Sequence, residues 1–425
     1  MAAAIAHEME TPRMDIAIVG GGIGGLTAAL YLHRAGIAVQ VYESAPAIEA
    51  LGVGINLFPH AVRRLTELGL EAPLSKVGIR PRRFSFYTQH GQLIHHEPAG
   101  LHAGYHWPHI SVHRADLHAV LLDAVRQRLG AERIHLGHHC AGFEQSETGM
   151  TIHFKHPQTG AALRSVRTDV AVGCDGIHSA IRRQLYPGEG KPVFGGINMW
   201  RGVMRGAPFL GGDSVTRVGP LVSGKLVIYP IRNFPDGSQL LNWVAEIRRE
   251  VDAPNDWHKP GRLSDFLPAY ERWRFDWLDI PDMLRRSEVV LEYPMVDRDP
   301  IDRWSFGRVT LLGDAAHPMY PRGGNGGAQA IIDADVLAQM LVRHADVVEA
   351  LRAYEAERAP KAAQVVRMNR SKPPDHIIEL TEQRSGGKPF ESLEAVLPRA
   401  ELEAVLEGYR KTAAYDVAAV NGGGI

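Results

Sequence analysis

The stretch DIAIVGGGIGG at residues 15–25 decides the fold of this chain. Residues 15–19 form a short apolar run typical of a buried β-strand, and the glycines after it lead into a segment whose apolar spacing suits a helix. Residues 37–42 then alternate like a second strand. A strand, a glycine turn, a helix and a strand within about 30 residues predict a βαβ unit in a parallel sheet.

Three glycines of this turn have the spacing G-x-G-x-x-G of a dinucleotide site. Gly20 permits the tight turn, Gly22 lets the backbone approach a pyrophosphate, and Gly25 allows the helix to pack closely on the sheet. Glu43 follows the second strand, where a carboxylate can accept the hydroxyl protons of an adenosine ribose. The pattern predicts a bound dinucleotide, and its alternative is a glycine-rich turn beside a surface glutamate.

Two further motifs follow apolar strands. Asp175-Gly176-x-x-Ser-x-x-Arg182 comes after the strand expected at residues 169–173. Gly-Asp314-Ala-Ala-His317-Pro follows the strand expected at 308–312 and continues into a glycine-rich run over 321–327. A carboxylate at a strand end can bind the hydroxyls of a sugar-like chain, and a glycine-rich helix start offers unpaired N–H groups to an anion.

The middle of the chain has a different pattern, with β-type stretches separated by Gly and Pro at 83–88, 193–205, 225–231 and 240–248. This pattern predicts an antiparallel sheet, after which the helical spacing over residues 328–342 returns to the first architecture. The expected fold class is α/β plus α+β, a Rossmann-like dinucleotide domain built from separated stretches with an inserted antiparallel-sheet domain.

The expected division of the chain has four parts. The dinucleotide-binding domain takes residues 14–80, 110–187 and 290–367, and the substrate-binding sheet domain takes 81–109 and 188–289. Residues 1–13 are expected to be a loose tail, and residues 368–425 a peripheral helical extension whose last stretch, from Asn421, is flexible.

Charge and cysteine content exclude several classes of protein. Of the 425 residues, 47 are Lys or Arg and 48 are Asp or Glu, so no excess charge favours a nucleic acid or an anionic membrane as a partner. The uncharged stretch 16–32 is broken by glycines and preceded by two glutamates, which argues against an export signal. Cys140 and Cys174, with no CxxC, exclude a disulfide framework and predict a cytoplasmic enzyme.

The chain is also rich in histidine, with 21 residues of this type. The clusters lack HExxH spacing and an accompanying carboxylate pattern, so no metal site is expected. Neither a GxSxG motif nor a P-loop is present, which argues against a hydrolase or an NTPase.

In their order along the chain, the three motifs resemble those of the single-component, FAD-dependent aromatic hydroxylases that share the para-hydroxybenzoate hydroxylase fold. The resemblance implies bound FAD, with NAD(P)H as a transient co-substrate because only one dinucleotide fingerprint is present. It also implies the reaction cycle, in which NAD(P)H reduces FAD, O2 adds to the flavin C4a, and the hydroperoxide transfers oxygen to an electron-rich aromatic ring.

The family's cofactor site is carried over residue by residue. Arg114 resembles the arginine beside the ribityl–phosphate region, and Asp314 resembles the aspartate that binds the ribityl chain. The full set of expected cofactor-binding residues is Gly20, Gly22, Gly25, Glu43, Gly54, Ile55, Arg114, Asp175, Gly176, Asp314, Gly323, Gly324, Asn325 and Gly326.

Fewer sequence features indicate which residues lie at the reactive edge of the flavin and in the substrate pocket. The candidates at the reacting edge of the flavin are His317, Pro321, Gly323 and Gly324. The candidates for the substrate pocket are Trp200, Tyr229, Pro318 and Met319. Plain core packing is the alternative for each aromatic residue, and capping of the turn is the alternative for His317.

Within the family, residues 199–203, 241–244 and 293–300 most resemble monooxygenases of phenazine carboxylates, which hydroxylate and decarboxylate a methylated phenazine. The likeness leaves open the aromatic substrate, the choice between NADH and NADPH, accompanying decarboxylation, and a monomer against a homodimer. Two other functions stay open, a FAD-binding protein without oxygenase activity and a dehydrogenase.

Overall fold

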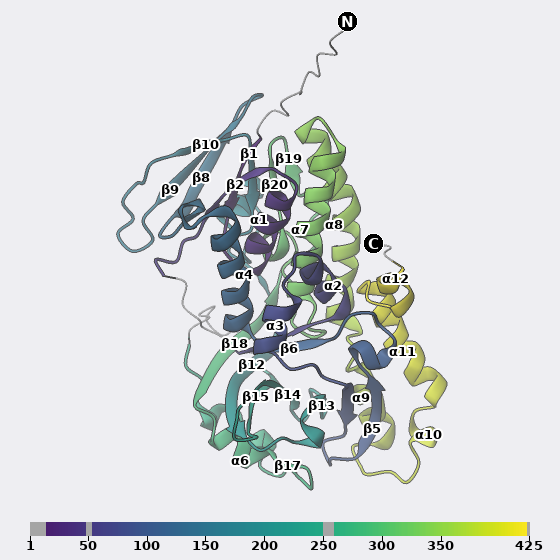
Figure 1. Cartoon of the computed structure of the whole chain (residues 1–425). Coiled ribbons are helices and arrows are strands. Elements are labelled where there is room, and N and C mark those ends of the chain that lie inside the picture. Colours follow the sequence, from purple (N-terminus) through teal and green to yellow (C-terminus); the bar gives the residue numbers. More distant parts are fainter. Residues whose placement is uncertain (1–13, 48–52, 250–258, 423–425) are drawn as a thin grey trace, which may run out of the picture.

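The computed structural model describes residues 14–47, 53–249 and 259–422, and Figure 1 shows its two large sheets one above the other. Our predictions of a loose tail over residues 1–13 and of a flexible end at residues 423–425 lie outside the described residues. No helix within the described ranges combines the length and the apolar composition needed to cross a bilayer.

The upper sheet of Figure 1 contains the predicted βαβ unit. Within the described residues its strand order is β19-β20-β11-β1-β2-β7. These strands are β1 (Asp15–Val19), β2 (Ala38–Tyr42), β7 (Ile134–His135), β11 (Val170–Gly173), β19 (Ser305–Phe306) and β20 (Val309–Leu311). β1 pairs in parallel with β2 and β11, and β11 pairs in parallel with β20. The carboxyl ends of β1, β11 and β20 therefore lie side by side.

Helices cover this sheet because their apolar faces match its buried strands. α1 (Ile23–Arg34) packs against α4 (Arg114–Leu129) and α7 (Gly326–Arg343), and α7 packs against α2 (Pro59–Glu67) and α8 (Val347–Ser371). Leu26 of α1 and Ile331 of α7 are fully buried. The predicted helix at 328–342 is confirmed, and it begins two residues earlier than expected.

The lower sheet has the order β18-β12-β15-β14-β13-β4-β5 in the described residues. Its strands are β4 (Arg83–Tyr87), β5 (Leu93–Pro98), β12 (Val193–Gly206), β13 (Ser214–Val218), β14 (Lys225–Asn233), β15 (Gln239–Arg248) and β18 (Val289–Asp297). Neighbours are antiparallel except β13 and β4, which pair in parallel. The predicted antiparallel sheet is thus confirmed with one parallel exception.

Two boundaries differ from those expected. The boundary at residue 290 falls inside β18, which pairs with β12 and so belongs to the lower sheet up to Asp297. The boundary at residue 368 falls inside α8, a helix that runs on to Ser371. A change of composition does not end either element, because the pairing of β18 with β12 and the internal hydrogen bonds of α8 continue across it.

The C-terminal segment is helical and lies along the outer edge of the molecule, where it packs against the lower sheet (Figure 1). Its helices are α9 (His376–Ser385), α10 (Leu393–Val396), α11 (Arg399–Thr412) and α12 (Val417–Asn421). Buried Leu402, Leu406 and Tyr409 share one hydrophobic cluster with Phe84 and Phe86 of the lower sheet. Asn421, expected to be flexible, ends α12, and its side chain donates a hydrogen bond to the Gly104 carbonyl at 2.8 Å.

Smaller elements complete the chain. The remaining helices are α3 (Glu71–Val77), α5 (Ala180–Leu185) and α6 (Ile280–Arg285). The remaining strands are β3 (Gly54–Leu57), β6 (Ile110–His113), β8 (His139–Gln145), β9 (Met150–Lys155), β10 (Val166–Thr168), β16 (Arg274–Phe275) and β17 (Leu278–Asp279). Short 3₁₀ turns are η1 (Gly100–Ala103), η2 (Ala131–Arg133), η3 (Leu210–Gly212), η4 (Leu263–Asp265), η5 (Leu267–Tyr270) and η6 (Gly313–Ala315).

Candidate functional site

A cavity of about 350 Å³ lies where the carboxyl ends of β1, β11 and β20 meet one face of the lower sheet. We call it the central cavity. Residues that follow β11 and β20 line it, together with strands of the lower sheet, the starts of α1 and α7, and strand β3. Ligands of open α/β sheets bind at the carboxyl ends of the strands, so the position fits a cofactor site.

The glycines after β1 have separate structural reasons. A Cβ atom on Gly25 would lie 2.0 Å from the Gly20 carbonyl oxygen, so only glycine allows the helix this close to the turn. Gly20 has a φ of +110°, and a Cβ there would lie 2.3 Å from the Cys174 carbonyl oxygen. Gly22, the residue before α1, lines the central cavity, and its Cβ would meet no atom within 4 Å. Gly22 therefore leaves space for a ligand at the helix start.

The carboxylate of Glu43 is held beside this turn. Its Oε2 accepts a hydrogen bond from the Gly21 N–H at 2.7 Å, and its Oε1 accepts one from the Ala45 N–H at 2.8 Å. Gly21 and Glu43 do not line the central cavity. The structure thus places Glu43 next to the turn that leads to Gly22, outside the wall of the cavity.

Asp175 and Arg182 act within the protein. Oδ2 of the half-buried Asp175 accepts a hydrogen bond from the Ala180 N–H at 2.7 Å, and desolvation raises the pKa of this carboxyl. Its flanking residues line the central cavity, whereas Asp175 does not. Arg182 donates to the carbonyl oxygens of Ala315 and Ala316 at 3.0 and 2.8 Å. The second motif therefore holds the η6 turn that carries Asp314.

Asp314 and the start of α7 face the central cavity. Asp314 is exposed there although the residues on both sides of it are buried. Pro321, Gly323, Gly324 and Gly326 also line this part. The first N–H groups of a helix have no partner within the helix, so the start of α7 offers donors and the positive end of a dipole to the cavity.

Two residues of the glycine run serve a different purpose from the one expected. Asn325 does not line the central cavity, and its Nδ2 donates to the Tyr409 hydroxyl at 3.4 Å. A Cβ on Gly323 would lie only 1.7 Å from the same hydroxyl oxygen. Position 323 therefore needs glycine because of a tyrosine of the C-terminal segment, a contact that no local motif reveals.

His317 lies outside the central cavity, which corrects its assignment as a candidate at the reacting edge. Its buried Nε2 lies 2.5 Å from Asp333 Oδ2, and Arg358 Nε donates to Asp333 Oδ1 at 2.7 Å. Burial alone raises the pKa of Asp333, but the charges of His317 and Arg358 and their hydrogen bonds outweigh it and lower the pKa to about 2. His317 thus helps to fix α7, and it does not face the central cavity.

Side chains alternate between the two faces of a strand, and this alternation decides whether Trp200 faces the central cavity. Met199 and Arg201 of β12 line the central cavity, so Trp200 between them points to the opposite face of the sheet. There Trp200 is fully buried and stacks on Phe266 at 5.1 Å, which corrects its assignment to the pocket. Tyr229 and Met319 line the central cavity, whereas Pro318 does not.

One group of residues on the cavity wall is charged and was not predicted from the sequence, namely Arg201, Arg217, Lys225, Glu246, Arg322 and Asp375. Lys225 Nζ lies 3.1 Å from Glu246 Oε2 and 2.6 Å from Asp375 Oδ2. Arg322 lies 3.5 Å from the same Asp375 oxygen. A signal was present for Arg201, Arg217 and Glu246, because each interrupts a mostly apolar strand segment.

The donors and acceptors on the cavity wall fit FAD. The open space at Gly22 and the start of α1 suit a pyrophosphate, and the carboxylate of Asp314 suits the hydroxyls of a ribityl chain. Arg114 adds a positive charge to the wall, and the start of α7 suits the pyrimidine end of a flavin. Among the described residues no group of His, Cys, Asp and Glu is arranged to hold a metal ion.

Comparisons with known proteins agree with this fit. Residues 13–220 and 279–369 match the family described as FAD binding domain. The phenazine 1,6-dicarboxylic acid hydroxylase PhzS of Lysobacter antibioticus is 44% identical over 364 residues, which are 84% of this chain and 89% of that protein. The 3-amino-4-hydroxybenzoate 2-monooxygenase PtnB3 of Streptomyces platensis is 34% identical over 372 residues, covering 86% of this chain and 89% of that protein.

Solved structures share the fold. Klebsiella pneumoniae HpxO, complexed with FAD and uric acid, superposes with a TM-score of 0.76 at 23% identity, over 95% of this chain and 97% of that chain. A salicylate hydroxylase substrate complex superposes with a TM-score of 0.72 at 23% identity, over 96% of this chain and 97% of that chain. At these identities the likeness shows the fold alone.

Proposed function

The chain belongs to the FAD binding domain family of flavin-dependent aromatic hydroxylases, and from this premise we propose that it hydroxylates a fused-ring aromatic acid with NAD(P)H and O2. The observation that carries the proposal is the central cavity itself. At one end it has the groups that fit FAD, and at the other it has an apolar floor bordered by cations. Both the cofactor and an acidic aromatic substrate therefore have a place in one cavity.

FAD, when bound, would supply the redox chemistry, which is hydride uptake from NAD(P)H and activation of O2. The residues of this chain bind the cofactor and orient it. The start of α7, with Gly324 and Gly326, provides N–H donors that stabilise negative charge at the pyrimidine end of the flavin. Asp314 and Arg114, which line the central cavity, would hold the chain between the flavin ring and the phosphates. No side-chain nucleophile is required.

The substrate end favours a flat and acidic molecule. Val227, Val244 and Met199 provide apolar floor, and Tyr229 and Met319 add larger side chains. Around this floor four cations face two carboxylates, namely Arg201, Arg217, Lys225 and Arg322 against Glu246 and Asp375. An acidic ligand compensates the excess positive charge. The 44% identical relative, a hydroxylase of a phenazine dicarboxylic acid, supports a fused-ring acid as substrate.

The cellular setting of the proposed enzyme follows from its sequence. We propose a cytoplasmic protein that acts as a monomer or a homodimer, with NAD(P)H bound only transiently because a second dinucleotide fingerprint is absent from the sequence. Size-exclusion chromatography with light scattering checks the oligomeric state, and stopped-flow reduction by NADH and by NADPH checks the donor.

The decisive experiment supplies the FAD-loaded protein with NAD(P)H, isotopically labelled O2 and a panel of hydroxybenzoates, quinolines and phenazine acids. We expect one panel member to accelerate NAD(P)H oxidation and to gain one labelled oxygen atom, detected by mass spectrometry. A flavoprotein that binds a ligand without oxygenating it, or a dehydrogenase, would give no labelled product with any aromatic compound. That result would contradict the proposal.

A further inference from the structure

Four neighbouring strands place two arginines at the ends of one row. Arg201 of β12 is paired in register with Val244 of β15, Val244 with Val227 of β14, and Val227 with Arg217 of β13. All four residues line the central cavity. Three strand spacings separate the two arginine backbones, which corresponds to about 14 Å. The row is therefore a narrow apolar floor with a guanidinium at each end.

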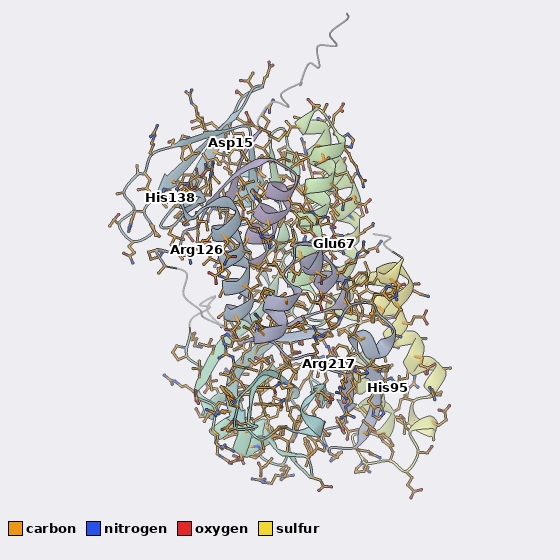
Figure 2. The ribbon with its side chains drawn as sticks, in the orientation of Figure 1. Asp15, Glu67, His95, Arg126, His138 and Arg217 are labelled. Carbon is orange, nitrogen blue, oxygen red and sulfur yellow. The ribbon has the colours of Figure 1, made fainter. Side chains whose placement is uncertain are left out.

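Arg217, labelled in Figure 2, is the more buried of the two arginines. It is 8% exposed, and its guanidinium lies 5.5 Å from the ring centre of Phe84 and 5.4 Å from that of Phe86. Across the residues that the structure describes, it has neither a hydrogen bond within 3.5 Å nor a carboxylate within 4.0 Å. A cation held between two rings is fixed in place, but its N–H donors remain without acceptors.

The charged groups near Arg217 are already engaged. Asp375 pairs with Lys225 and Arg322, and Glu97 pairs with Arg410 at 2.5 Å. His109 nearby is a neutral ring, since burial, with the charge of Arg217, lowers its pKa to about 3. No neighbouring carboxylate is left over for Arg217, although a buried and unpaired cation is costly. A ligand in the central cavity is the remaining source of an anion.

Arg201 at the other end of the row is also incompletely paired. Its terminal nitrogen donates to the Gly54 carbonyl at 3.3 Å, while its Nε is buried without a partner among the described residues. We propose that Arg201 and Arg217 bind two acidic groups of one planar aromatic substrate that lies over Val227 and Val244, so that Arg217 selects diacids over monoacids. The inference rests on the proposed function, because it names the substrate class of the same cavity.

A planar diacid fits the row for physical reasons. A guanidinium binds a carboxylate with two parallel hydrogen bonds, which fixes both distance and orientation. Two such pairs at opposite ends hold a rigid ring system in one register over the floor. A monoacid satisfies only one arginine and leaves the other buried and unpaired, which lowers its affinity.

The test measures binding of two probes to the FAD-loaded protein by titration calorimetry, phenazine-1,6-dicarboxylate and phenazine-1-carboxylate. We expect the unchanged protein to bind the diacid at least about tenfold more tightly than the monoacid. In Arg217→Met we expect diacid affinity to fall about 100-fold with monoacid affinity little changed, and Arg217→Lys should recover part of the loss.

Arg205→Met is the matched control. Arg205 also lies on β12 but is exposed and pairs with Asp236 at 2.7 Å, so the variant removes the same charge outside the central cavity and should leave both affinities unchanged. Equal affinity of the unchanged protein for both probes would overturn the inference even if Arg217→Met failed to fold. Loss of FAD in a folded Arg217→Met protein would also overturn it. The proposed function fails separately, if no aromatic compound is oxygenated.

Discussion

The two ends of the central cavity are built in different ways. At the cofactor end, turns after β1 and β20 present backbone N–H groups and Asp314, and each turn is one continuous stretch of sequence. At the substrate end, five strands of the lower sheet contribute one or a few side chains each, and the C-terminal segment contributes Asp375. The cofactor end is thus built by short segments, and the substrate end by alternate residues of distant segments.

This difference explains where a substitution should act. At the cofactor end, Gly25 is required by packing inside the protein. Its near neighbour Gly22 leaves the space that a ligand needs. At the substrate end we expect a single side chain to change the ligand preference without affecting the cofactor. The predictions below separate these roles, beginning with the largest expected effect.

Gly25→Ala should break the cofactor end outright. The added Cβ would lie 2.0 Å from a backbone oxygen, so α1 must move away from β1 and we expect a loss of more than about 4 kcal/mol of folding free energy. Gly22→Ala is the matched control, because its Cβ meets nothing within 4 Å. That variant should keep its stability and bind FAD more weakly. Urea unfolding and flavin titration distinguish the two, and equal stability losses would contradict our account of the turn.

Asp333→Asn should destabilise the support behind the cofactor end. The change leaves the buried Arg358 without its carboxylate, which we expect to cost about 3 kcal/mol of folding free energy. Urea unfolding at neutral pH measures this loss. The variant should still bind FAD when folded, because Asp333 does not line the central cavity.

The lowered pKa of Asp333 should make the stability of the protein depend on pH. Its pKa is lowered from 3.8 to about 2, so its contribution of about 2 kcal/mol is present above about pH 4 and is lost as the pH falls toward 2. Between pH 5 and pH 3 the free energy of unfolding, measured by urea, should therefore fall less for Asp333→Asn than for the unchanged protein. Identical slopes would show that Asp333 does not carry the effect.

Asp314→Ala should act on the cofactor with little effect on folding. Asp314 is exposed in the central cavity, and removing a charged acceptor of ribityl hydroxyls should cost about 2 kcal/mol of binding, or about 30-fold in the FAD dissociation constant. Flavin fluorescence titration measures the change. Unaltered affinity would remove Asp314 from the cofactor site and would weaken the division between the two ends.

Tyr409→Phe should have the smallest effect, and it tests the link between the C-terminal segment and the glycine run. The hydroxyl donates to Asn369 Oδ1 at 2.7 Å and accepts from Asn325, so its loss should cost about 1 kcal/mol of folding free energy. Tyr415→Phe serves as a comparison at a neighbouring buried ring, since the Tyr415 hydroxyl makes no hydrogen bond within the described part of the chain. Equal losses in both variants would contradict the proposed link.

Sequence reasoning succeeded where function depends on consecutive residues. The strand at residues 15–19 and the helix after it are as expected, and Gly22, Asp314 and Gly326 line one cavity although they are far apart in the chain. Spacing was sufficient there because a tight turn between a strand and a helix admits few backbone conformations.

Sequence reasoning failed where orientation decided the role. Trp200 was selected for its aromatic ring, but the strand turns it away and presents Arg201 instead. His317 was selected for its neighbours in sequence, but its ring pairs with Asp333 behind α7. Neither outcome is encoded locally, because the residue on the facing element determines which side of a strand or turn is buried.

The sequence by itself indicated the cofactor and the chemistry it serves, because three motifs in the order of a known family point to FAD, whereas the glycine turn alone predicts only a dinucleotide. Only the tertiary structure decided which residues meet the substrate. Arg217 and Asp375 belong to segments about 160 positions apart, and their common place at the cavity depends on strand register and on the docking of the C-terminal helices. Register and docking follow from the packing of the whole chain, which no short motif specifies.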